Sequence, residues 1–253
     1  MESFTLLGIK VHSLTVLELH QKISEAILNN KKLLVFNVNI NAYYISKRDK
    51  IFNQILNWSD IIFCDGLGVI LGARMLGHHI AERITYAEWF PRLSAMSEQK
   101  GYKLFLLGGR PGIAEQAAGK LVEKYPQLKI VGVHHGYFNK TGKENEKIIG
   151  EINRSQPNIL LVCFGMPHQE KWIWENRERL DAQVYLDGGA CLDFVSMKVK
   201  RAPRWIIRIG LEWLYRLMHE PRRLWRRYLI GNAWFFFSIL KAKILEGQTK
   251  GDN

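Results

Sequence analysis

One carboxylate in this chain follows an apolar run directly and is itself followed by two closely spaced glycines. Asp65 comes after Ile61–Cys64, and Gly66 and Gly68 stand just beyond it. A carboxylate at the end of a strand can accept a proton from a substrate, and the glycines would let that substrate approach the backbone. The pattern favours a general base at Asp65, although an aspartate here could also cap a helix.

Polar residues that could bind a substrate stand at two further boundaries of this kind. Asn37 and Asn39 alternate at the end of another apolar run, where they could line a pocket or serve as turn and helix N-cap residues. Arg83 and Thr85 place a cation and a hydroxyl just before a helical pattern. Arg83 could clamp a phosphate or a carboxylate, or form a surface ion pair with a neighbouring glutamate.

Two glycine turns join apolar runs to helical patterns. The first contains Gly108 and Gly109 and would expose backbone N–H groups to an anion at a helix N-terminus. It has neither the Gly-Lys-Ser/Thr of a P-loop nor G-x-G-x-x-G spacing, which argues against ATP hydrolysis and dinucleotide binding. The second, Gly165–Glu170, would project Gln169 toward the cleft and leave Glu170 for capping and solvation.

A tyrosine and two pairs of adjacent histidines complete the candidate residues. Tyr137 follows an apolar run and could stack on a flat ring such as a nucleobase. The pairs His134-His135 and His78-His79 would point to opposite sides of an extended segment, and no H-x-x-x-H or cysteine partner accompanies them, so we expect no metal site. No Asp-x-Asp triplet occurs either, so arginines and helix dipoles would have to neutralise a bound diphosphate.

Short apolar runs alternate with longer amphipathic stretches along most of the chain. The runs predict strands at 33–38, 61–64, 103–107, 129–133, 159–164 and 183–186. The stretches between them predict helices, among them 14–29, 86–99, 112–125 and 168–180. This alternation predicts an α/β protein with a Rossmann-like open, mostly parallel sheet and helices on both faces. Ligands bind such sheets at the carboxyl ends of the strands, where the polar residues above would lie.

The pattern changes near residue 197, so we interpret residues 1–197 as the core and residues 198–253 as a basic, helical C-terminal appendage. From Lys198 to Leu245 there are 12 basic residues and two acids, so this segment carries +10 of the formal net charge of +12. Nine aromatic residues interleave with these charges. The appendage therefore fits an anionic partner: a nucleic acid, an anionic bilayer surface, or an anionic small molecule held partly by its lipid.

Length and composition fit a folded cytosolic protein. The 253 residues suffice for one α/β domain with an appendage, and 47% hydrophobic with 24% charged residues argue against disorder. Cys64, Cys163 and Cys191 are far apart in sequence and are expected to be reduced thiols. We expect no signal peptide. The longest plausible membrane stretch, Tyr228–Leu240, has 13 uncharged residues, fewer than the ~20 of a membrane span, so we expect the appendage to lie on a bilayer.

An ordered series of motifs resembles the TagA/CpsF/WecG glycosyltransferases, also called glycosyltransferase family 26. The series covers roughly residues 5 to 230, and its order and spacing are more specific than any single motif. The motifs are Asn39, Asp65-Gly66-x-Gly68, Glu82-Arg83-Ile84-Thr85, Leu107-Gly108-Gly109, His135-Gly136-Tyr137-Phe138, Gly165-x-Pro167-x-Gln169-Glu170, Gly188-Gly189-Ala190 with Asp193-Phe194, Arg201-Ala202-Pro203-x-Trp205, Leu211 to Leu217, and Glu220-Pro221-x-Arg223.

The resemblance implies an inverting, metal-independent enzyme that needs no cofactor. It would move a sugar from a UDP-sugar to a polyprenyl-diphosphate-linked saccharide, in the synthesis of teichoic acid linkage units or of other cell-wall polysaccharides and exopolysaccharides. We therefore expect a cytoplasmic protein attached peripherally to the inner face of the cell membrane through its appendage. The C-terminal aromatics could instead pack between the subunits of a homo-oligomer.

Motif matching also implies roles for individual residues. Asp65 resembles the general base, with Arg83 and Gln169 beside it in the catalytic pocket. The implied substrate contacts are Asn37, Asn39, Thr85, Arg216, Arg223 and Arg226, and the implied nucleotide contacts are Gly108, Gly109, Tyr137 and Asp193. The three C-terminal arginines would close over the diphosphate and stabilise the departing UDP. The residues expected to face a membrane or a second subunit are Trp225, Trp234–Phe237, Arg222, Arg227, Lys241 and Lys243.

Two departures from the family pattern leave the donor sugar open. Many members read Thr-x-Asn-Pro where this chain has Asn37-Val38-Asn39-Ile40, and many have glycine and aspartate where this chain has Tyr86-Ala87-Glu88-Trp89. N-acetylmannosamine is the default donor sugar, and glucose and N-acetylmannosaminuronic acid are alternatives. A catalytically silent membrane adaptor or a nucleic-acid-binding protein would also use a basic appendage, but binding nucleic acid requires neither the Asp65 nor the Gln169 motif.

Overall fold

The computed structural model describes residues 1–199, 202–208 and 210–251. Within these residues the chain forms a six-stranded, all-parallel sheet in the order β4-β3-β8-β7-β5-β6, which confirms the predicted fold class. Each strand begins and ends within one residue of its predicted bounds. The strands are β3 (Leu33–Val38), β4 (Ile61–Cys64), β5 (Lys103–Gly108), β6 (Lys129–His134), β7 (Ile159–Cys163) and β8 (Val184–Asp187).

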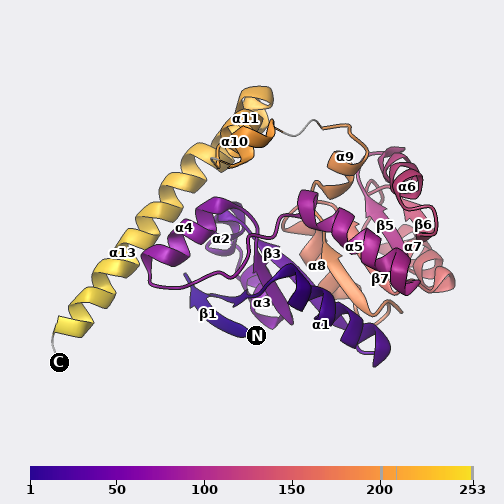
Figure 1. The fold of residues 1–253 in the computed structure, drawn as a ribbon, viewed down its shortest axis with the longest axis horizontal. Helices are drawn as coiled ribbons and strands as arrows, with labels where there is room; N and C mark the ends of the chain where they lie inside the picture. Colours follow the sequence, from indigo (N-terminus) through magenta and orange to yellow (C-terminus); the bar gives the residue numbers. More distant parts are fainter. Residues whose placement is uncertain (200–201, 209, 252–253) are drawn as a thin grey trace.

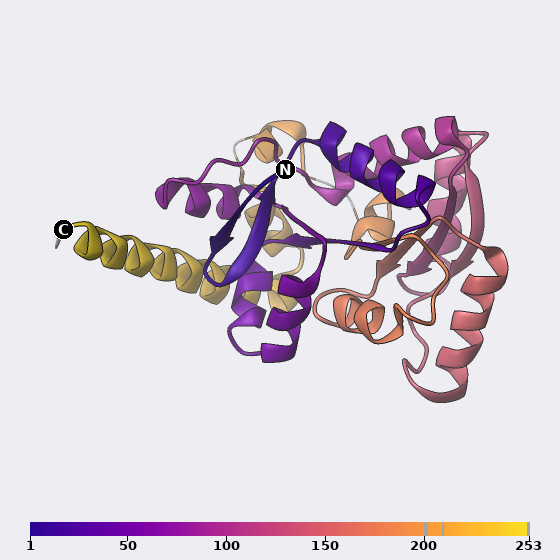
Figure 2. The same cartoon turned by 90° about the horizontal axis from the view of Figure 1, so that it is seen from below.

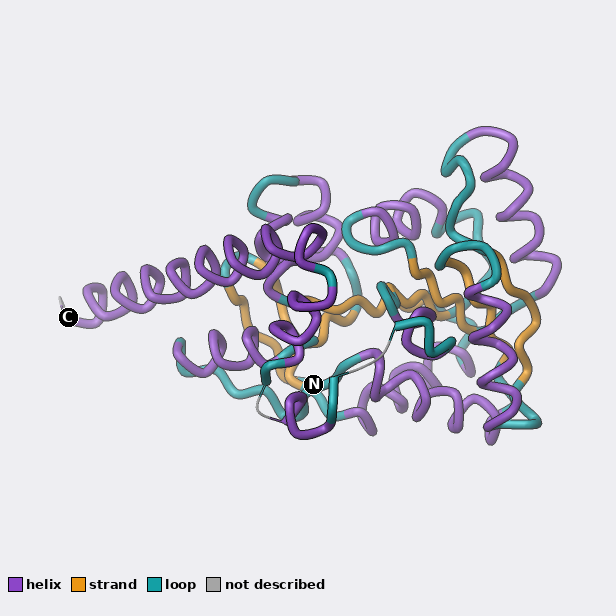
Figure 3. The backbone as a smooth tube through the Cα atoms, turned by 90° about the horizontal axis from the view of Figure 1, so that it is seen from above, coloured by secondary structure: helices purple, strands orange, loops and turns teal. Residues whose placement is uncertain are grey.

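Helices cover both faces of the sheet, and the side chains of each strand alternate between two cores. In β3, Phe36 and Val38 belong to one core and Val35 to the other. The helices on the Val35 face are α1 (Val16–Leu28), α5 (Tyr86–Lys100), α6 (Ile113–Lys124) and α9 (Cys191–Val195). The helices on the opposite face are α2 (Ile40–Ser46), α3 (Lys50–Trp58), α4 (Leu67–Met75), α7 (Gly142–Ser155) and α8 (His168–Asn176). Figure 3 shows the strands between these helical layers.

An antiparallel hairpin, drawn in indigo in Figure 2, precedes the sheet and was not predicted from the sequence. It pairs β1 (Glu2–Leu6) with β2 (Ile9–Ser13) through a turn in which Leu7 and Gly8 both have positive φ. The backbone N–H of Ile62 donates to His12 Nδ1 at 2.9 Å, so the hairpin lies against β4. The edge strand that precedes Asp65 is therefore covered.

The C-terminal segment forms a series of helices that returns across the core. They are α10 (Arg204–Arg208), α11 (Glu212–His219), α12 (Pro221–Trp225), a single π-helical turn η1 (Arg226–Ile230) and α13 (Gly231–Gly251). In Figure 1, α10 and α11 lie at one end of α13, which passes α2 and α4 and projects beyond the body of the protein. The appendage is thus helical, as predicted.

One face of α13 belongs to the protein core. Phe235 and Ile239 are both fully buried. Phe235 packs so closely on α4 that a Cβ added to Gly72 would stand 2.7 Å from its ring. The expectation that the whole run Trp234–Phe237 faces a membrane or a second subunit is therefore wrong for Phe235. Phe237, on the opposite side of the helix, is 69% exposed.

The stretch Arg226–Leu245 is long and apolar enough to cross a membrane, judged by length and composition alone. It exceeds the 13 residues expected from the sequence because the helix continues past Lys241 and Lys243 to further apolar residues. This is weak evidence for a span, since Phe235 and Ile239 already pack in the core.

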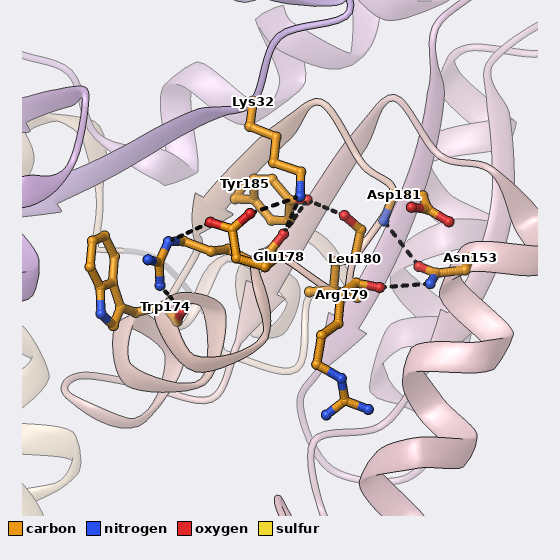
Figure 4. A network of polar contacts seen from close by, with 9 residues as sticks. Lys32, Asn153, Trp174, Glu178, Arg179, Leu180, Asp181 and Tyr185 are labelled. Carbon is orange, nitrogen blue, oxygen red and sulfur yellow. Dashed lines mark hydrogen bonds and ion pairs between the residues drawn. The ribbon is translucent and has the colours of Figure 1, made fainter.

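Polar contacts fasten the connection between α8 and β8 at the amino ends of the strands (Figure 4). Lys32 Nζ donates to the carbonyl oxygen of Arg177 at 2.6 Å, and the Tyr185 hydroxyl donates to that of Leu180 at 2.8 Å. Asn153 Oδ1 accepts from the backbone N–H of Asp181, and Asn153 Nδ2 donates to the carbonyl oxygen of Arg179. A polar depression of about 350 Å³ opens beside this network, far from the carboxyl ends of the strands where ligands bind.

Candidate active site

Asp65 follows β4 directly, and its side chain is half-buried at the carboxyl end of the sheet. Its backbone N–H donates to the Val38 carbonyl oxygen at 2.9 Å, which continues the pairing of β4 with β3. Gly66 takes a φ of +104°, a value that favours glycine, and begins α4 as the N-cap without a side-chain bond. Asp65 therefore does not cap α4, and its carboxylate is left to face the site.

The charges around Asp65 suit a proton acceptor. Burial, together with the negative charge of Glu212, raises the pKa of Asp65 to about 7. The guanidinium groups of Arg227, Arg83 and Arg216 act in the opposite direction. A carboxylate with a pKa near neutrality can take a proton efficiently at physiological pH.

The appendage reaches the Asp65 site in this structure. Gly210 lies against α4, where a Cβ would stand 2.4 Å from Leu67 Cδ2. The Arg216 guanidinium is 5.3 Å from the centre of the Phe194 ring, and its Nε is buried without a hydrogen-bond partner. Arg216 is thus a half-buried cation close to Asp65.

Arg227 and Arg226 are placed differently from expectation. Arg227, predicted to face a membrane or a second subunit, is half-buried and lowers the pKa of the Asp65 carboxyl. Arg226 is exposed and lies over the Trp225 ring at 5.2 Å. The Arg223 side chain lies outside the described part of the structure. Among the appendage arginines whose side chains the structure describes, Arg216 and Arg227 are therefore the ones brought to Asp65.

Arg83, Thr85 and Asn39 flank the same strand ends. The positive charge of Arg83 lowers the pKa of Asp65, and Arg83 forms a 3.6 Å ion pair with Glu88. Its position is therefore compatible both with clamping an anionic ligand and with a surface ion pair. Thr85 is the N-cap of α5, yet its hydroxyl makes no capping bond and is buried without a hydrogen-bond partner. Asn39 caps α2, with Oδ1 accepting from the Ala42 N–H at 3.2 Å. The capping interpretation of Asn39 is thereby confirmed.

Asn37 and Gln169 are buried and bonded to the protein. Asn37 donates through Nδ2 to Asp187 Oδ1 at 3.1 Å, while its own Oδ1 is buried without a partner. Gln169 Oε1 accepts from the N–H groups of Gly165 at 2.9 Å and Gly189 at 3.0 Å. Gln169 is 0% exposed, so it holds two loops together rather than projecting into an open cleft.

Two buried acids in this network were not identified as site residues from the sequence. Glu170 is 0% exposed, so the expectation that it is solvated is wrong, while its carboxylate accepts from its own backbone N–H in the first turn of α8. Asp187, the last residue of β8, is also 0% exposed and accepts from the Tyr86 hydroxyl at 2.9 Å. The only sequence signal was an aspartate that follows an apolar run directly, the same signal that marked Asp65.

Three of the predicted nucleotide contacts, Gly108, Gly109 and Tyr137, lie at the other end of the sheet. Gly108 and Gly109 both have positive φ, and a Cβ on Gly108 would stand 2.5 Å from the Cys163 carbonyl oxygen. Gly136 donates to the Gly109 carbonyl oxygen at 2.8 Å, which joins the loops after β5 and β6. Tyr137 follows and is 66% exposed, so its ring is open to a ligand. Asp193 lies half-buried on α9.

Lys140 stands beside Tyr137 and was not singled out from the sequence. Its Nζ donates to the carbonyl oxygens of Gly136 at 2.6 Å and Phe138 at 3.1 Å. The same ammonium lies 3.4 Å from the centre of the Phe138 ring and 4.1 Å from that of Phe164. Burial lowers the pKa of Lys140 to about 8. Lys140 fixes the shape of the loop that presents Tyr137.

The site is elongated. Three strands, β3, β8 and β7, separate β4, which precedes Asp65, from β5, which ends in the glycine turn. At about 4.8 Å between neighbouring strands, these two ends of the site are roughly 19 Å apart. A ligand with two parts, or two ligands side by side, would be needed to occupy both ends. Among the described residues, no group of three or more His, Cys, Asp and Glu side chains is arranged to hold a metal ion.

The site is long and lies at the strand ends, with a carboxylate whose pKa is near 7 at one end and a glycine turn at the other. Such a site suits an enzyme that transfers a group between two substrates. The sequence profile of the WecG/TagA/CpsF family of glycosyl transferases matches residues 4–249. The chain therefore belongs to this family and is a glycosyltransferase, as the motifs indicated.

Three relatives with similar sequences share one name, N-acetylglucosaminyldiphosphoundecaprenol N-acetyl-beta-D-mannosaminyltransferase. The protein of Bacillus subtilis (strain 168) is 32% identical over 196 residues, which are 78% of this chain and 75% of the relative. That of Bacillus spizizenii (strain ATCC 23059 / NRRL B-14472 / W23) is 29% identical over 200 residues, which are 79% of this chain and 76% of the relative. That of Staphylococcus aureus (strain MRSA252) is 27% identical over 240 residues, 94% and 92% of the two chains.

Proposed function

We propose that this enzyme transfers N-acetylmannosamine from its UDP derivative to N-acetylglucosaminyl-diphosphoundecaprenol, with inversion at the anomeric carbon and without a metal ion. The names of the relatives support the transferred sugar and the acceptor. The family motifs support UDP as the leaving group. The observation that carries the proposal is Asp65 with its pKa near 7 beside Arg83, Arg216 and Arg227.

The reaction would proceed in one displacement at the Asp65 end of the site. Asp65 accepts the proton of an acceptor-sugar hydroxyl as that oxygen forms its bond to the anomeric carbon of the donor. The bond from that carbon to the diphosphate breaks on the opposite side, and UDP leaves with the bonding electrons. Arg216 and Arg227 stabilise the charge that develops on the diphosphate. One carboxylate suffices, because direct inversion forms no covalent sugar–enzyme intermediate.

The donor nucleotide would extend from this centre toward β5 and β6. The glycine turn at Gly108 and Gly109 offers close backbone approach, and the exposed Tyr137 ring can stack on uracil. Lys140 holds the loop that carries Tyr137. The separation of this region from Asp65 suits a ligand built of a sugar, a diphosphate and a nucleoside.

The proposed reaction is tested directly by a panel of UDP-sugars. The purified protein is incubated with a soluble short-chain analogue of the lipid acceptor, and the released UDP is measured. UDP-N-acetylmannosamine should give acceptor-dependent release well above that from UDP-glucose and UDP-N-acetylmannosaminuronic acid. Release from another UDP-sugar alone would reject the proposed donor.

The pH dependence of the reaction should report Asp65. Because the base must be ionised, kcat/KM is expected to fall as the pH drops below about 7. Glu212→Gln removes a negative charge that raises the pKa of Asp65, so this fall should move to lower pH. The check is the pH profile of kcat/KM, with Glu175→Gln on the exposed side of α8 as control. An unmoved profile in Glu212→Gln would contradict the placement of α11 at Asp65.

We further propose that α13 attaches the enzyme peripherally to the cytoplasmic face of the membrane. The side of α13 that carries the exposed Phe237, Leu240 and Ile244 is apolar, and the exposed Lys241 and Lys243 adjoin it. Such a surface suits an anionic bilayer, in which apolar side chains insert and cations meet the headgroups. A soluble acceptor analogue would bypass this requirement.

Membrane attachment through α13 predicts the behaviour of a double variant. Phe237→Glu with Leu240→Glu should lower partitioning onto phosphatidylglycerol-containing vesicles about tenfold or more, because two exposed apolar contacts are lost. Vesicle flotation measures this, with Leu17→Glu and Leu28→Glu, two exposed leucines of α1, as the matched control. Equal flotation of both double variants would reject α13 as the attachment surface.

A further inference from the structure

Two buried carboxyl groups meet beneath the strand ends, and the proposed displacement uses neither. Asp187 ends β8, Glu170 lies in the first turn of α8, and their side chains are hydrogen-bonded to each other. Both are 0% exposed. Among the described residues, the groups that hydrogen-bond to the two carboxyls include Gln169, Asn37 and Tyr86, and none of these is a cation. Burying two negative charges together without a cation is very costly, so the pair must retain a proton.

The hydrogen-bond donors around the pair decide where that proton lies. Asp187 Oδ1 accepts from the Tyr86 hydroxyl at 2.9 Å and from Asn37 Nδ2 at 3.1 Å, while Oδ2 accepts from the Asn37 N–H at 2.9 Å. Glu170 accepts from Gln169 Nε2 at 2.9 Å and from its own backbone N–H, and its Oε2 is buried without a donor. Donors stabilise the charged form of the carboxyl that they reach. Asp187 receives more of them than Glu170, so the hydrogen bonds favour an ionised Asp187 and a proton on Glu170.

The surroundings of the pair include three other titratable groups. Tyr86 from α5 has its pKa raised by burial and by the Asp187 charge. Cys163 from β7 and Cys191 from α9 are buried thiols whose pKa values are raised by burial and by neighbouring charges. All three are neutral at physiological pH, so none supplies a counter-charge. A proton on Glu170 is then what compensates the second carboxyl.

The pair ties together four elements of the proposed substrate site. Asp187 holds Asn37 at the end of β3 and Tyr86 at the start of α5, the residue next to Thr85. The Asp187 carbonyl oxygen accepts from Gln169 Nε2 at 3.0 Å, and Gln169 in turn holds the loops after β7 and β8. Movement of either acid would therefore displace the polar groups around the donor sugar.

We propose that Glu170 and Asp187 share one proton and act as a positioning pair that fixes Asn37, Gln169 and the start of α5 around the donor sugar. The identity of the ligand rests on the proposed function, whereas the shared proton does not. In terms of the reaction, the two acids are positioning residues and make no contact with the reacting atoms.

The arrangement of hydrogen-bond donors predicts different effects for the two variants that replace one acid by its neutral amide. In Glu170→Gln, the new amide can donate to the Asp187 carboxylate permanently and still accept from Gln169, so it mimics the protonated glutamate. In Asp187→Asn, an amide NH₂ replaces one acceptor among the donors of Asn37 and Tyr86, so two donors face each other. Glu170→Gln should therefore be tolerated and Asp187→Asn should not.

The shared proton can be observed by infrared spectroscopy, through the C=O stretch of a protonated carboxyl group. Asp65 would contribute to the same band, so the spectra are recorded at neutral pH in an Asp65→Asn background. The band should be present in that background, absent after the further change Glu170→Gln, and retained with Glu175→Gln on the same helix. A band that persists with Glu170→Gln would overturn the proposal, and this arm remains informative if Asp187→Asn fails to fold.

The kinetics of the same variants, measured with the native Asp65, then distinguish an effect on substrate positioning from an effect on stability alone. Glu170→Gln should change the donor KM and kcat less than about threefold, whereas Asp187→Asn should raise the donor KM about tenfold or more with a smaller effect on kcat. Tolerance of Asp187→Asn with failure of Glu170→Gln would place the proton on Asp187 and overturn the assignment. If the wild type turns over no UDP-sugar while Glu170→Gln still removes the infrared band, the proposed function fails and the shared-proton pair stands.

Discussion

Replacing Asp65 by asparagine is expected to lower kcat about 10²- to 10⁴-fold, the scale on which general bases contribute. The change keeps the size and most of the shape of the side chain but removes its capacity to take a proton. The measurement is acceptor-dependent UDP release at saturating donor and acceptor. Because Asp65 is assigned to the chemical step, the loss should fall on kcat, with little change in the donor KM.

Stability measurements show whether such a loss reflects chemistry or misfolding. Burial raises the pKa of Asp65 to about 7, above its unfolded value, so folding favours the protonated form. That contribution to stability is fully present below the unfolded pKa and is lost as the pH rises through about 7. Asp65→Asn should therefore unfold at an equal or higher temperature than the wild type at alkaline pH. A variant that is both inactive and less stable there would not support the assignment of a base.

Removing the two appendage arginines that reach Asp65 is expected to cause the second-largest loss. The double change Arg216→Ala with Arg227→Ala should lower kcat about 10²- to 10³-fold, because both cations would stabilise charge that develops on the departing diphosphate. Arg216→Lys should restore part of the loss of Arg216→Ala, since it returns the charge without the planar fork. The assay uses the soluble acceptor analogue, so membrane attachment does not enter.

Arg222→Ala is the matched control for this loss. Arg222 lies on α12 within the same basic segment, but its side chain is exposed. Its removal should change kcat less than about threefold, as expected for a surface charge. A similar loss in Arg222→Ala and in the double variant would mean that net charge, rather than placement at Asp65, explains the effect.

The positions of the strands and of Asp65 could be predicted because both are local properties of the chain. Each strand is an apolar run with clear ends, and Asp65 follows such a run directly. The β1–β2 hairpin escaped prediction because polar residues interrupt the apolar residues of both strands and its turn depends on positive φ at Leu7 and Gly8.

The contacts of the buried acids could not be predicted, because they depend on the order of the strands. Asp187 meets Asn37, 150 positions earlier in the chain, only because β8 inserts between β3 and β7. In the absence of that order, nothing distinguishes Asp187 from a turn residue after a strand. Glu170 likewise looks like a solvated helix residue until α8 is placed on the sheet.

The directions in which the C-terminal arginine side chains point are hard to predict because the helical periodicity is broken beside them. The stretch Arg226–Ile230 is a π-helical turn, which shifts the phase of the helix relative to 3.6 residues per turn. Arg227 lowers the pKa of Asp65 while Arg226 stays exposed. A sequence pattern that assumes a regular helix does not include this shift. The burial of Phe235 follows similarly from a tertiary contact, its packing on Gly72.

The most direct test of the central claim is the single-turnover rate at which labelled N-acetylmannosamine moves from its UDP donor to an N-acetylglucosaminyl-diphosphate lipid. The rate is measured for the wild type and for Asp65→Asn side by side. The account predicts a labelled lipid-linked disaccharide from the wild type and a rate lower by about 10²-fold or more in the variant. Equal rates in the two proteins, or no labelled product from the wild type, would contradict it.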